Sequence, residues 1–280
     1  MTTIFHVSDL HFGRPAVPEQ IFAIEAMIQE GKFDVVAVSG DVSQRAKSGE
    51  FQRAAVFLRD AQKVSQTIIV PGNHDVSWWR APIGIGPYRK IFDAYKKWIF
   101  HDLEPVLSIP GVTLVGLNTS HGVTHRTLTW NVRDISIIGY VTRAQLSTLR
   151  EKFDRVPADD VRIVVMHHNP VKGELSQRHG LKNTRRVLDA FAEMGVDVVL
   201  SGHDHQEAVH YIEHTKKGTV VSTAGTVSNR SRGGRPSSAN LIRVLPAAIE
   251  VTTLIWSPDK ETFVPGPHKS FSRAVPAKTA

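Results

Sequence analysis

The sequence predicts an α/β fold in which two packed mixed sheets lie between outer helices, a four-layer αββα sandwich. Three observations predict this class. Over the first two thirds of the chain, short apolar stretches alternate with amphipathic ones. From about residue 206 onward the pattern changes to strands and turns. Groups of Asp, His and Asn follow several strand-like stretches, which favours a metal site at the C-terminal ends of strands.

The strand-like stretches of the first two thirds are short apolar runs, and the first of them, TTIFHVS, begins near the N-terminus. Each run ends at a group of polar or glycine residues, as buried strands of a parallel sheet do. We expect strands at 2–8, 34–39, 66–70, 112–118, 134–141, 161–166 and 196–202.

Helical stretches separate these strands. Residues 18–30 carry apolar side chains with a spacing near 3.6, and Pro18 suits the first turn of a helix. Ser48 and Thr142 are candidate N-caps for two later helices. We expect helices at 18–30, 48–62, 87–100, 142–153 and 183–195.

The domain organisation follows from this order. We expect a single domain over 1–264, with an aromatic-rich insertion at 76–103 and a strand-rich part at 206–264. The stretch 265–280 contains three prolines and little apolar content, and we interpret it as a flexible tail.

The composition is that of an ordinary globular protein, with 41% hydrophobic and 22% charged residues. The 280 residues include no cysteine, which excludes disulfides and thiolate metal sites, so a metal would be held by His, Asp, Glu, Asn or backbone oxygen. The formal charge of +7 favours anionic partners such as phosphate esters. The N-terminus reads as a strand, not as a signal peptide, and no run reaches membrane-span length, so we expect a cytoplasmic protein without membrane contact.

Five of the predicted strands end in motifs that carry Asp, His or Asn. If these strands share a sheet edge, their side chains converge on one place. Each motif alone is equally well explained as an ordinary turn or a solvated loop. Together and in this order, the motifs favour a metal site. The motifs are SDLH with Asp9 and His11, SGDVSQ with Asp41, VPGNHD with Asn73, His74 and Asp75, VVMHHNP with His167, and SGHDH with His203 and His205.

This ligand set contains only oxygen and nitrogen, which suits manganese, iron, cobalt, zinc or nickel. There are too many ligands for one ion, whereas two ions about 3.5–4 Å apart and bridged by a carboxylate would use them. A water bridging two cations ionises near neutral pH and becomes an attacking hydroxide, and the ions neutralise a phosphoryl group in the transition state.

The five ordered motifs resemble those of the calcineurin-like metallophosphoesterase superfamily, over roughly residues 3–206. The text around them, DLHFGRP, GDVSQRA and EFQRAAVFL, is similar to that of the bacterial class III cyclic nucleotide phosphodiesterases and their relatives. The resemblance implies a phosphoric ester hydrolase with two divalent or trivalent metal ions, with manganese, iron and zinc as the candidates.

Carried over by position, the resemblance implies a role for each motif. Asp9, His11 and His205 would hold one ion. Asn73, His167 and His203 would hold the other. Asp41 would bridge both. His74 would contact the phosphate together with Asn73 and protonate the leaving oxygen; a structural hydrogen bond is the alternative for His74.

Residues near the motifs are less well defined by the sequence. His168 follows His167 directly, and strand parity sends its side chain to the other face, so we interpret it as a neighbour of the site. Asp75 would orient a histidine or cap the following turn. Arg14, Arg45 and Trp78 are further candidates for substrate contacts.

The leading hypothesis is a dinuclear phosphodiesterase that cleaves a small phosphodiester, such as a cyclic nucleotide, by attack of a metal-bridging hydroxide. A nuclease or a nucleotide-linked pyrophosphatase of the same superfamily is the alternative, although no basic stretch with interleaved aromatics marks a nucleic-acid channel. A non-catalytic binding protein on this fold ranks last, because the full ligand set is present. The aromatic insertion and the strand-rich end are candidates for a homodimer surface.

Overall fold

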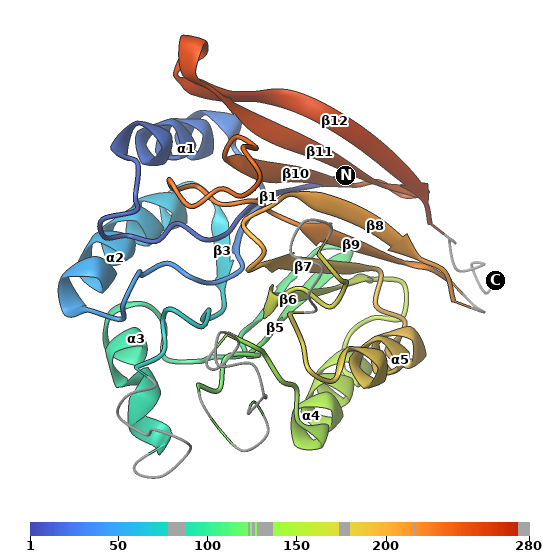
Figure 1. The fold of residues 1–280 in the computed structure, drawn as a ribbon. Coiled ribbons are helices and arrows are strands. Elements are labelled where there is room, and N and C mark those ends of the chain that lie inside the picture. The colour runs from blue at the N-terminus through green and yellow to red at the C-terminus, as the bar shows by residue number, and fades with distance from the viewer. Residues whose placement is uncertain are drawn as a thin grey trace.

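The computed structural model of the chain describes residues 1–77, 88–122, 124, 127, 137–173, 180–214 and 217–273. These residues form two six-stranded mixed sheets packed face to face, with helices on the outer faces (Figure 1). The αββα sandwich predicted from the sequence is confirmed.

The first sheet has the strand order β12-β11-β10-β1-β2-β3. Its three N-terminal strands are parallel, so their carboxyl ends meet at one edge, and the three C-terminal strands join by antiparallel pairing. The bounds are β1 (Thr2–Val7), β2 (Val35–Val38), β3 (Gln66–Ile69), β10 (Ser238–Val244), β11 (Ala248–Ser257) and β12 (Thr262–Ser272).

The second sheet has the order β4-β5-β6-β7-β9-β8. Its four central strands are parallel and its two edge strands are antiparallel to their neighbours. The bounds are β4 (Val106–Ile109), β5 (Val112–Leu117), β6 (Val161–His168), β7 (Val198–Gly202), β8 (Ala208–Ile212) and β9 (Thr219–Thr223).

The helices cover the two outer faces: α1, α2 and α3 lie beside the first sheet, and α4 and α5 beside the second (Figure 1). The expected helix at 87–100 is divided into a 3-10 helix (η3) and α3. No helix in the described ranges has the length and apolar content of a membrane span. The bounds are α1 (Pro18–Gly31), α2 (Ser48–Gln62), η3 (Tyr88–Phe92), α3 (Asp93–Trp98), α4 (Arg143–Asp154), α5 (Thr184–Met194) and a 3-10 turn, η5 (Pro258–Lys260).

Alternation along the strands builds the layers. In β1, Phe5 and Val7 pack toward α1 and α2, whereas Ile4 packs between the two sheets. This period of two follows from the pleat, which points successive side chains to opposite faces. Both faces of the strand are buried, which explains why the strands read as continuous apolar runs rather than as alternating ones.

One of the two predicted helix caps is confirmed. The Thr142 hydroxyl accepts a hydrogen bond from the Gln145 N–H at 3.1 Å, and the Gln145 side chain accepts from the Thr142 N–H at 2.9 Å. Ser48, in contrast, is the first residue of α2 and not its cap. Glu50 instead forms side-chain hydrogen bonds at the start of that helix: its Oε2 accepts from the N–H groups of Arg45 and Lys47.

Two segment predictions are wrong. No strand forms over the described residues 137–141; Gly139 makes only an isolated bridge to Leu181, and the Ile137 carbonyl accepts from the His168 ring and not from a neighbouring strand. Residues 134–136 lie outside the described residues.

The predicted tail from residue 265 is in fact part of β12 as far as Ser272. Pro265 and Pro267 suggested a loop, but proline is tolerated in an edge strand, and β12 is the edge of the first sheet. Residues 274–280 lie outside the described residues.

Candidate metal centre

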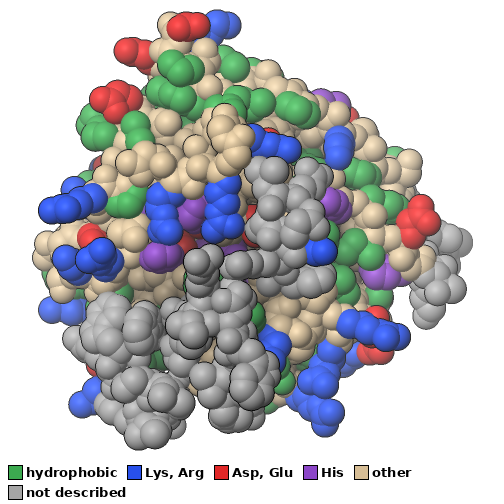
Figure 2. Space-filling view, in the orientation of Figure 1, with side chains coloured by type: hydrophobic (Ala, Val, Ile, Leu, Met, Phe, Trp, Pro, Cys, Tyr) green, Lys and Arg blue, Asp and Glu red, His purple; other side chains and the backbone are tan. Residues whose placement is uncertain are grey.

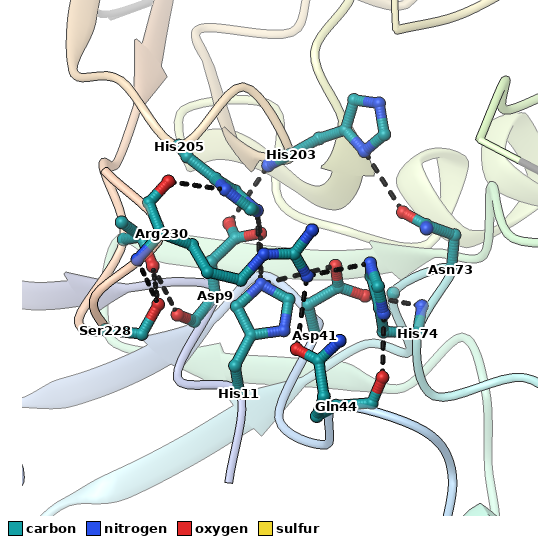
Figure 3. Close-up of polar contacts among 12 residues, drawn as sticks. Asp9, His11, Asp41, Gln44, Asn73, His74, His203, His205, Ser228 and Arg230 are labelled. Carbon is teal, nitrogen blue, oxygen red and sulfur yellow. Dashed lines mark hydrogen bonds and ion pairs between the residues drawn. The ribbon is translucent and has the colours of Figure 1, made fainter. Parts of the chain in front are cut away.

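The candidate site lies where the carboxyl ends of parallel strands from both sheets come together. The loops after β1, β2 and β3 approach it from the first sheet, and the end of β6 and the loop after β7 approach it from the second. In Figure 3 the side chains of Asp9, His11 and Asp41 point toward one another beneath His205. The five motifs predicted from the sequence to meet do so.

The first group of candidate ligands combines the loop after β1, which carries Asp9 and His11, with the loop after β7, which carries His205. The Nε2 atom of His205 lies 3.1 Å from Asp9 Oδ1 and 3.1 Å from His11 Nε2. His11 Nε2 is 3.6 Å from Asp9 Oδ1. All three residues are buried, and with Asp41 their ligand atoms lie within 4.8 Å of one another.

The second group lies beside the first and comes from β3, β6 and β7. The Asn73 Oδ1 atom is 3.0 Å from His167 Nε2 and 3.1 Å from His203 Nδ1. The two histidine nitrogens are themselves 3.3 Å apart. An oxygen and two imidazole nitrogens therefore converge on a single point.

Asp41 lies between the two groups. Its Oδ2 is 3.9 Å from His11 Nε2 and 3.3 Å from His167 Nε2. Its Oδ1 accepts a hydrogen bond of 2.8 Å from the His74 N–H, which fixes the carboxylate plane. One carboxylate thus reaches toward both groups.

Hydrogen bonds set the direction of several ligand atoms. His167 Nδ1 lies 2.8 Å from the Ser39 carbonyl and His205 Nδ1 lies 3.0 Å from the Arg230 carbonyl. A carbonyl only accepts, so both Nδ1 atoms donate and both Nε2 atoms point into the centre. Asp9 uses Oδ2 to accept from Ser8, and its buried Oδ1 has no hydrogen-bond partner in the part of the chain that the structure describes.

The backbone is held in an unusual conformation at these residues. The φ angles are +55° at Asp9, +45° at His11, +53° at Asp41, +74° at His203 and +55° at His205. Non-glycine residues rarely adopt this left-handed region, and each instance costs on the order of 1–3 kcal/mol. The backbone strain is therefore concentrated at the candidate ligands.

The centre carries a strong negative potential. Burial would raise the pKa values of Asp9 and Asp41, yet the charges and hydrogen bonds of the surrounding histidines hold both pKa values well below their usual range. Burial also opposes protonation of His167, but the charges of Asp41 and Asp9 and two hydrogen bonds outweigh it and raise the His167 pKa to about 9. A cation bound here would take over this compensation from the proton on His167, because a ligating imidazole is neutral.

These residues fit a pair of bound ions. The donor set is carboxylate, amide oxygen and imidazole, which suits divalent transition metals. Burial, followed by the charge on His167, lowers the pKa of His203 to about 3, so this imidazole is neutral, as a metal ligand must be. Asp9 Oδ1, which has no hydrogen-bond partner among the described residues, is a buried polar atom whose partner would be an ion.

His168 lies close enough to His167 and His203 to count geometrically as a third ligand of that group. Its ring is nevertheless fully engaged: Nδ1 lies 2.7 Å from the Thr119 hydroxyl and Nε2 2.8 Å from the Ile137 carbonyl. Since Nε2 donates to the carbonyl and Nδ1 accepts from the hydroxyl, no lone pair is free for an ion. The hydrogen bonds support its interpretation as a neighbour that packs beside the site.

Asp75 ties loops together rather than orienting a histidine. Its Oδ1 accepts from the Ser43 N–H at 2.7 Å and from the Ser43 hydroxyl at 2.8 Å, and its Oδ2 accepts from the Gly72 N–H at 2.9 Å. Burial and the charge of Asp41 raise the Asp75 pKa to about 7 against these hydrogen bonds. The loops that carry Asp41 and Asn73 are thereby held in register.

His74 lies at the edge of the cluster and is partly exposed. Its Nδ1 donates to the Gln44 carbonyl at 2.8 Å, so its Nε2 is an acceptor, and the Arg230 Nη1 lies 3.1 Å from it. Arg230 and Gln44 are residues that the sequence analysis missed. The weak signal for Arg230 was a run of arginines among glycines and serines, SNRSRGGR, after a strand.

The remaining sequence candidates are not brought into the cluster. Arg14 is exposed and lines a separate cavity of about 430 Å³ with Lys47 and Arg53. Arg45 is exposed, with its backbone bonded to Glu50. Trp78 lies outside the described residues.

Comparison with known proteins places these observations in context. A family model described as calcineurin-like phosphoesterase matches residues 2–207. No match was found among curated proteins.

Solved structures share the fold at low sequence identity. Purple acid phosphatase PPD1 from yellow lupin (Lupinus luteus) has a TM-score of 0.68 and 11% identity, over 97% of this chain and 54% of that one. GAP50, the anchor in the inner membrane complex of Plasmodium, has a TM-score of 0.57 and 13% identity, over 99% of this chain and 90% of that one. TT1561 of Thermus thermophilus has a TM-score of 0.50 and 15% identity, over 95% of this chain and 98% of that one. The chain spans about half the length of the lupin phosphatase.

Proposed function

The chain belongs to the calcineurin-like phosphoesterase family, and from this premise we propose that it is a phosphodiesterase that hydrolyses a small phosphodiester such as a cyclic nucleotide. The family and the His and Asp cluster support a dinuclear metal-dependent phosphoesterase. The preference for a diester, and for a cyclic nucleotide among diesters, is the proposal.

One observation carries the proposal: a single buried carboxylate, Asp41, lies between two groups of candidate ligands. We assign Asp9, His11 and His205 to one ion and Asn73, His167 and His203 to the other, with Asp41 shared. Manganese, iron and zinc all suit this set of donors. Bound there, two ions would neutralise charge on a phosphoryl group and supply an activated water.

The residues at the rim have roles of their own. His74 lies beside the ligands, is partly exposed, and faces the same space as Arg230. We assign to His74 the contact with the phosphoryl group, together with Asn73, and the delivery of a proton to the leaving oxygen. His74 Nε2 accepts a hydrogen bond from Arg230 in this structure. To deliver a proton, Nε2 must first take one up and lose its hydrogen bond to Arg230.

Two alternatives remain as outcomes of the test. A nuclease or a nucleotide-linked pyrophosphatase would use the same cluster on a larger substrate. A non-catalytic binding protein would keep the fold without turnover. The complete ligand set supports the catalytic hypothesis over the second alternative, because strained backbone at five candidate ligands is typical of a functional metal site.

The test is a substrate panel on the full chain loaded with manganese. It contains bis(p-nitrophenyl) phosphate, p-nitrophenyl phosphate, 3',5'-cyclic AMP, 2',3'-cyclic AMP and single-stranded DNA. We expect hydrolysis of the diester chromogen and of a cyclic nucleotide, and loss of both on treatment with a chelator. Hydrolysis of DNA alone would favour the nuclease, and no turnover of any substrate would contradict the proposal.

A further inference from the structure

Arg230 lies in the loop that follows β9 and reaches across the mouth of the metal centre (Figure 3). We propose that its guanidinium binds a non-bridging oxygen of the substrate phosphoryl group, and that residues 226–230 are built to hold it there. The inference rests on the proposed function and adds a residue outside the five motifs.

The backbone of Arg230 is fixed to the metal site by buried hydroxyls. Its N–H donates to Ser228 Oγ at 3.3 Å, and Ser228 Oγ lies 2.7 Å from Thr226 Oγ1. Thr226 Oγ1 in turn donates to the Asp9 carbonyl at 2.7 Å. Since that bond uses the Thr226 hydrogen, the chain of donors runs from Arg230 through Ser228 and Thr226 to Asp9. Both hydroxyl residues are buried, so the chain is shielded from water.

The carbonyl of the same residue orients a candidate ligand. It accepts the hydrogen bond from His205 Nδ1 at 3.0 Å. Arg230 therefore touches one side of the centre with its backbone. Its side chain extends to the other side, where Nη1 lies 3.1 Å from His74 Nε2 and 3.1 Å from Gln44 Oε1.

The charge of this arginine has no carboxylate partner among the residues that the structure describes. Its hydrogen-bond partners there are the neutral acceptors His74 and Gln44, and both bonds use Nη1. The Nη2 and Nε atoms have no hydrogen-bond partner in the described part of the chain. A guanidinium offers five N–H donors in a rigid fork that matches phosphate oxygens. These N–H groups, at the open side of the cluster, are placed to donate to an anion.

Arg235 in the same loop shows the opposite arrangement. Its Nη1 lies 3.0 Å from Glu207 Oε1, so its charge is compensated within the protein. Figure 2 shows basic side chains beside histidine side chains near the middle of the face drawn. The difference between the two arginines makes Arg235 a matched control for Arg230.

A purely structural role for Arg230 makes a different prediction. If the guanidinium only positioned His74, its loss would change proton delivery and leave anion affinity unchanged. If it supported the loop, its loss would lower the metal content through His205. The bonds to Ser228 and His205 come from the Arg230 backbone, which a side-chain substitution keeps. Phosphate affinity and metal content therefore distinguish a substrate contact from both structural roles.

The experiment compares Arg230→Gln, Arg230→Lys and the control Arg235→Gln with the wild type, all loaded with manganese. Three quantities are measured: metal content by elemental analysis, the affinity for inorganic phosphate by calorimetry, and kcat and KM for bis(p-nitrophenyl) phosphate. We expect Arg230→Gln to keep its metal, to bind phosphate on the order of 10- to 100-fold more weakly and to lose a similar factor in kcat/KM. Arg230→Lys should fall between, and Arg235→Gln should match the wild type.

Several results would overturn the inference. They are phosphate affinity in Arg230→Gln within twofold of the wild type, metal loss in that variant, and an equal effect in Arg235→Gln. Phosphate binding needs no turnover, so it separates the two claims: if the wild type hydrolyses no phosphodiester but its phosphate affinity depends on Arg230, the proposed function fails while the anion contact stands.

Discussion

His167 and His168 are adjacent in β6 but contact different partners. His167 points Nε2 at Asn73 and Asp41, whereas both ring nitrogens of His168 are bonded to Thr119 and Ile137. An ion needs a free lone pair, so the doubled histidine supplies one candidate ligand and one structural residue.

Substitution of each histidine by alanine should separate these roles. His167→Ala removes a ligand and should abolish hydrolysis and lower the manganese content. His168→Ala should keep its manganese but lose about 3 kcal/mol of unfolding free energy, because it leaves a cavity and unpaired polar partners. Elemental analysis and urea unfolding check both. Equal metal loss in the two variants would contradict the assignment.

His6 is a buried histidine in β1 that lies outside the two groups of candidate ligands. Its Nε2 lies 2.9 Å from the Ser39 hydroxyl, and burial, which outweighs the charge of Asp9, lowers its pKa to about 3. The pKa in the unfolded chain is near 6.5. A histidine held neutral in this way stabilises the fold above pH 6.5, and the stability is lost as the pH falls toward 3.

This gives a pH prediction. Between pH 6.5 and 4.5 the wild type should lose about 2–3 kcal/mol more unfolding free energy than His6→Leu, in which the titrating group is absent. Urea unfolding at the two pH values measures the difference. Parallel losses in both proteins would show that His6 does not titrate in this way.

At the residue scale, the sequence was sufficient to predict those candidate ligands that lie in short motifs directly after a strand. Asp9, His11 and Asn73 each follow a strand, and their convergence could be predicted from the parallel order. Arg230 could not be predicted, because it reaches His74 through a contact between residues 156 positions apart. Likewise, the pairing of His168 with Thr119 depends on the packing of neighbouring strands.

At the scale of elements, the turns after the parallel strands determine the site. The loops after β2 and β3 pass so close to each other that a side chain on Gly72 would overlap the carboxylate and backbone nitrogen of Asp41. Asp75 fastens the same loops through Ser43. The position of Asp41 therefore depends on a glycine in the next loop.

Two glycine substitutions test this dependence. Gly72→Ala should abolish hydrolysis and reduce the metal content, since Asp41 must move. Gly49→Ala, in α2 with nothing within 4 Å of the added methyl group, should be neutral or stabilise by up to about 1 kcal/mol. Activity, metal content and thermal unfolding are compared. Wild-type activity in Gly72→Ala would show that the close approach is not required.

Elements with a clear period could be predicted, and those decided by tertiary contacts could not. The helices α1 and α4 were found within a residue or two, because their apolar spacing is regular. The strand β12 was missed because its prolines outweighed Phe263 and Phe271 in the sequence, whereas an edge strand tolerates them.

At the scale of the whole molecule, the C-terminal strands complete the sheet that carries the first ligands. The strands β10, β11 and β12 extend the first sheet beyond β1, and Phe263 of β12 packs on Trp256 in the core next to α1. The family model ends at residue 207, so these strands lie beyond the matched region. The first of them, β10, follows the loop that carries Arg230 and pairs with β1.

The contribution of β12 is measurable. Phe263→Ala should lower the unfolding free energy by about 3–5 kcal/mol, because the side chain is 3% exposed. Phe22→Ala is the matched control: its side chain is 66% exposed, and we expect a change within about 0.5 kcal/mol. Equal effects in urea unfolding would contradict the packing of β12 as part of the core.

The central claim is that Asp41 is shared by two metal ions. The direct measurement is the manganese content per chain, by elemental analysis after loading and gel filtration, for the wild type, Asp41→Ala and Asp41→Asn, with hydrolysis of bis(p-nitrophenyl) phosphate on the same samples. We predict about two ions in the wild type, and loss of both ions and of hydrolysis in the variants. Two retained ions and wild-type hydrolysis in a folded Asp41 variant would contradict the account.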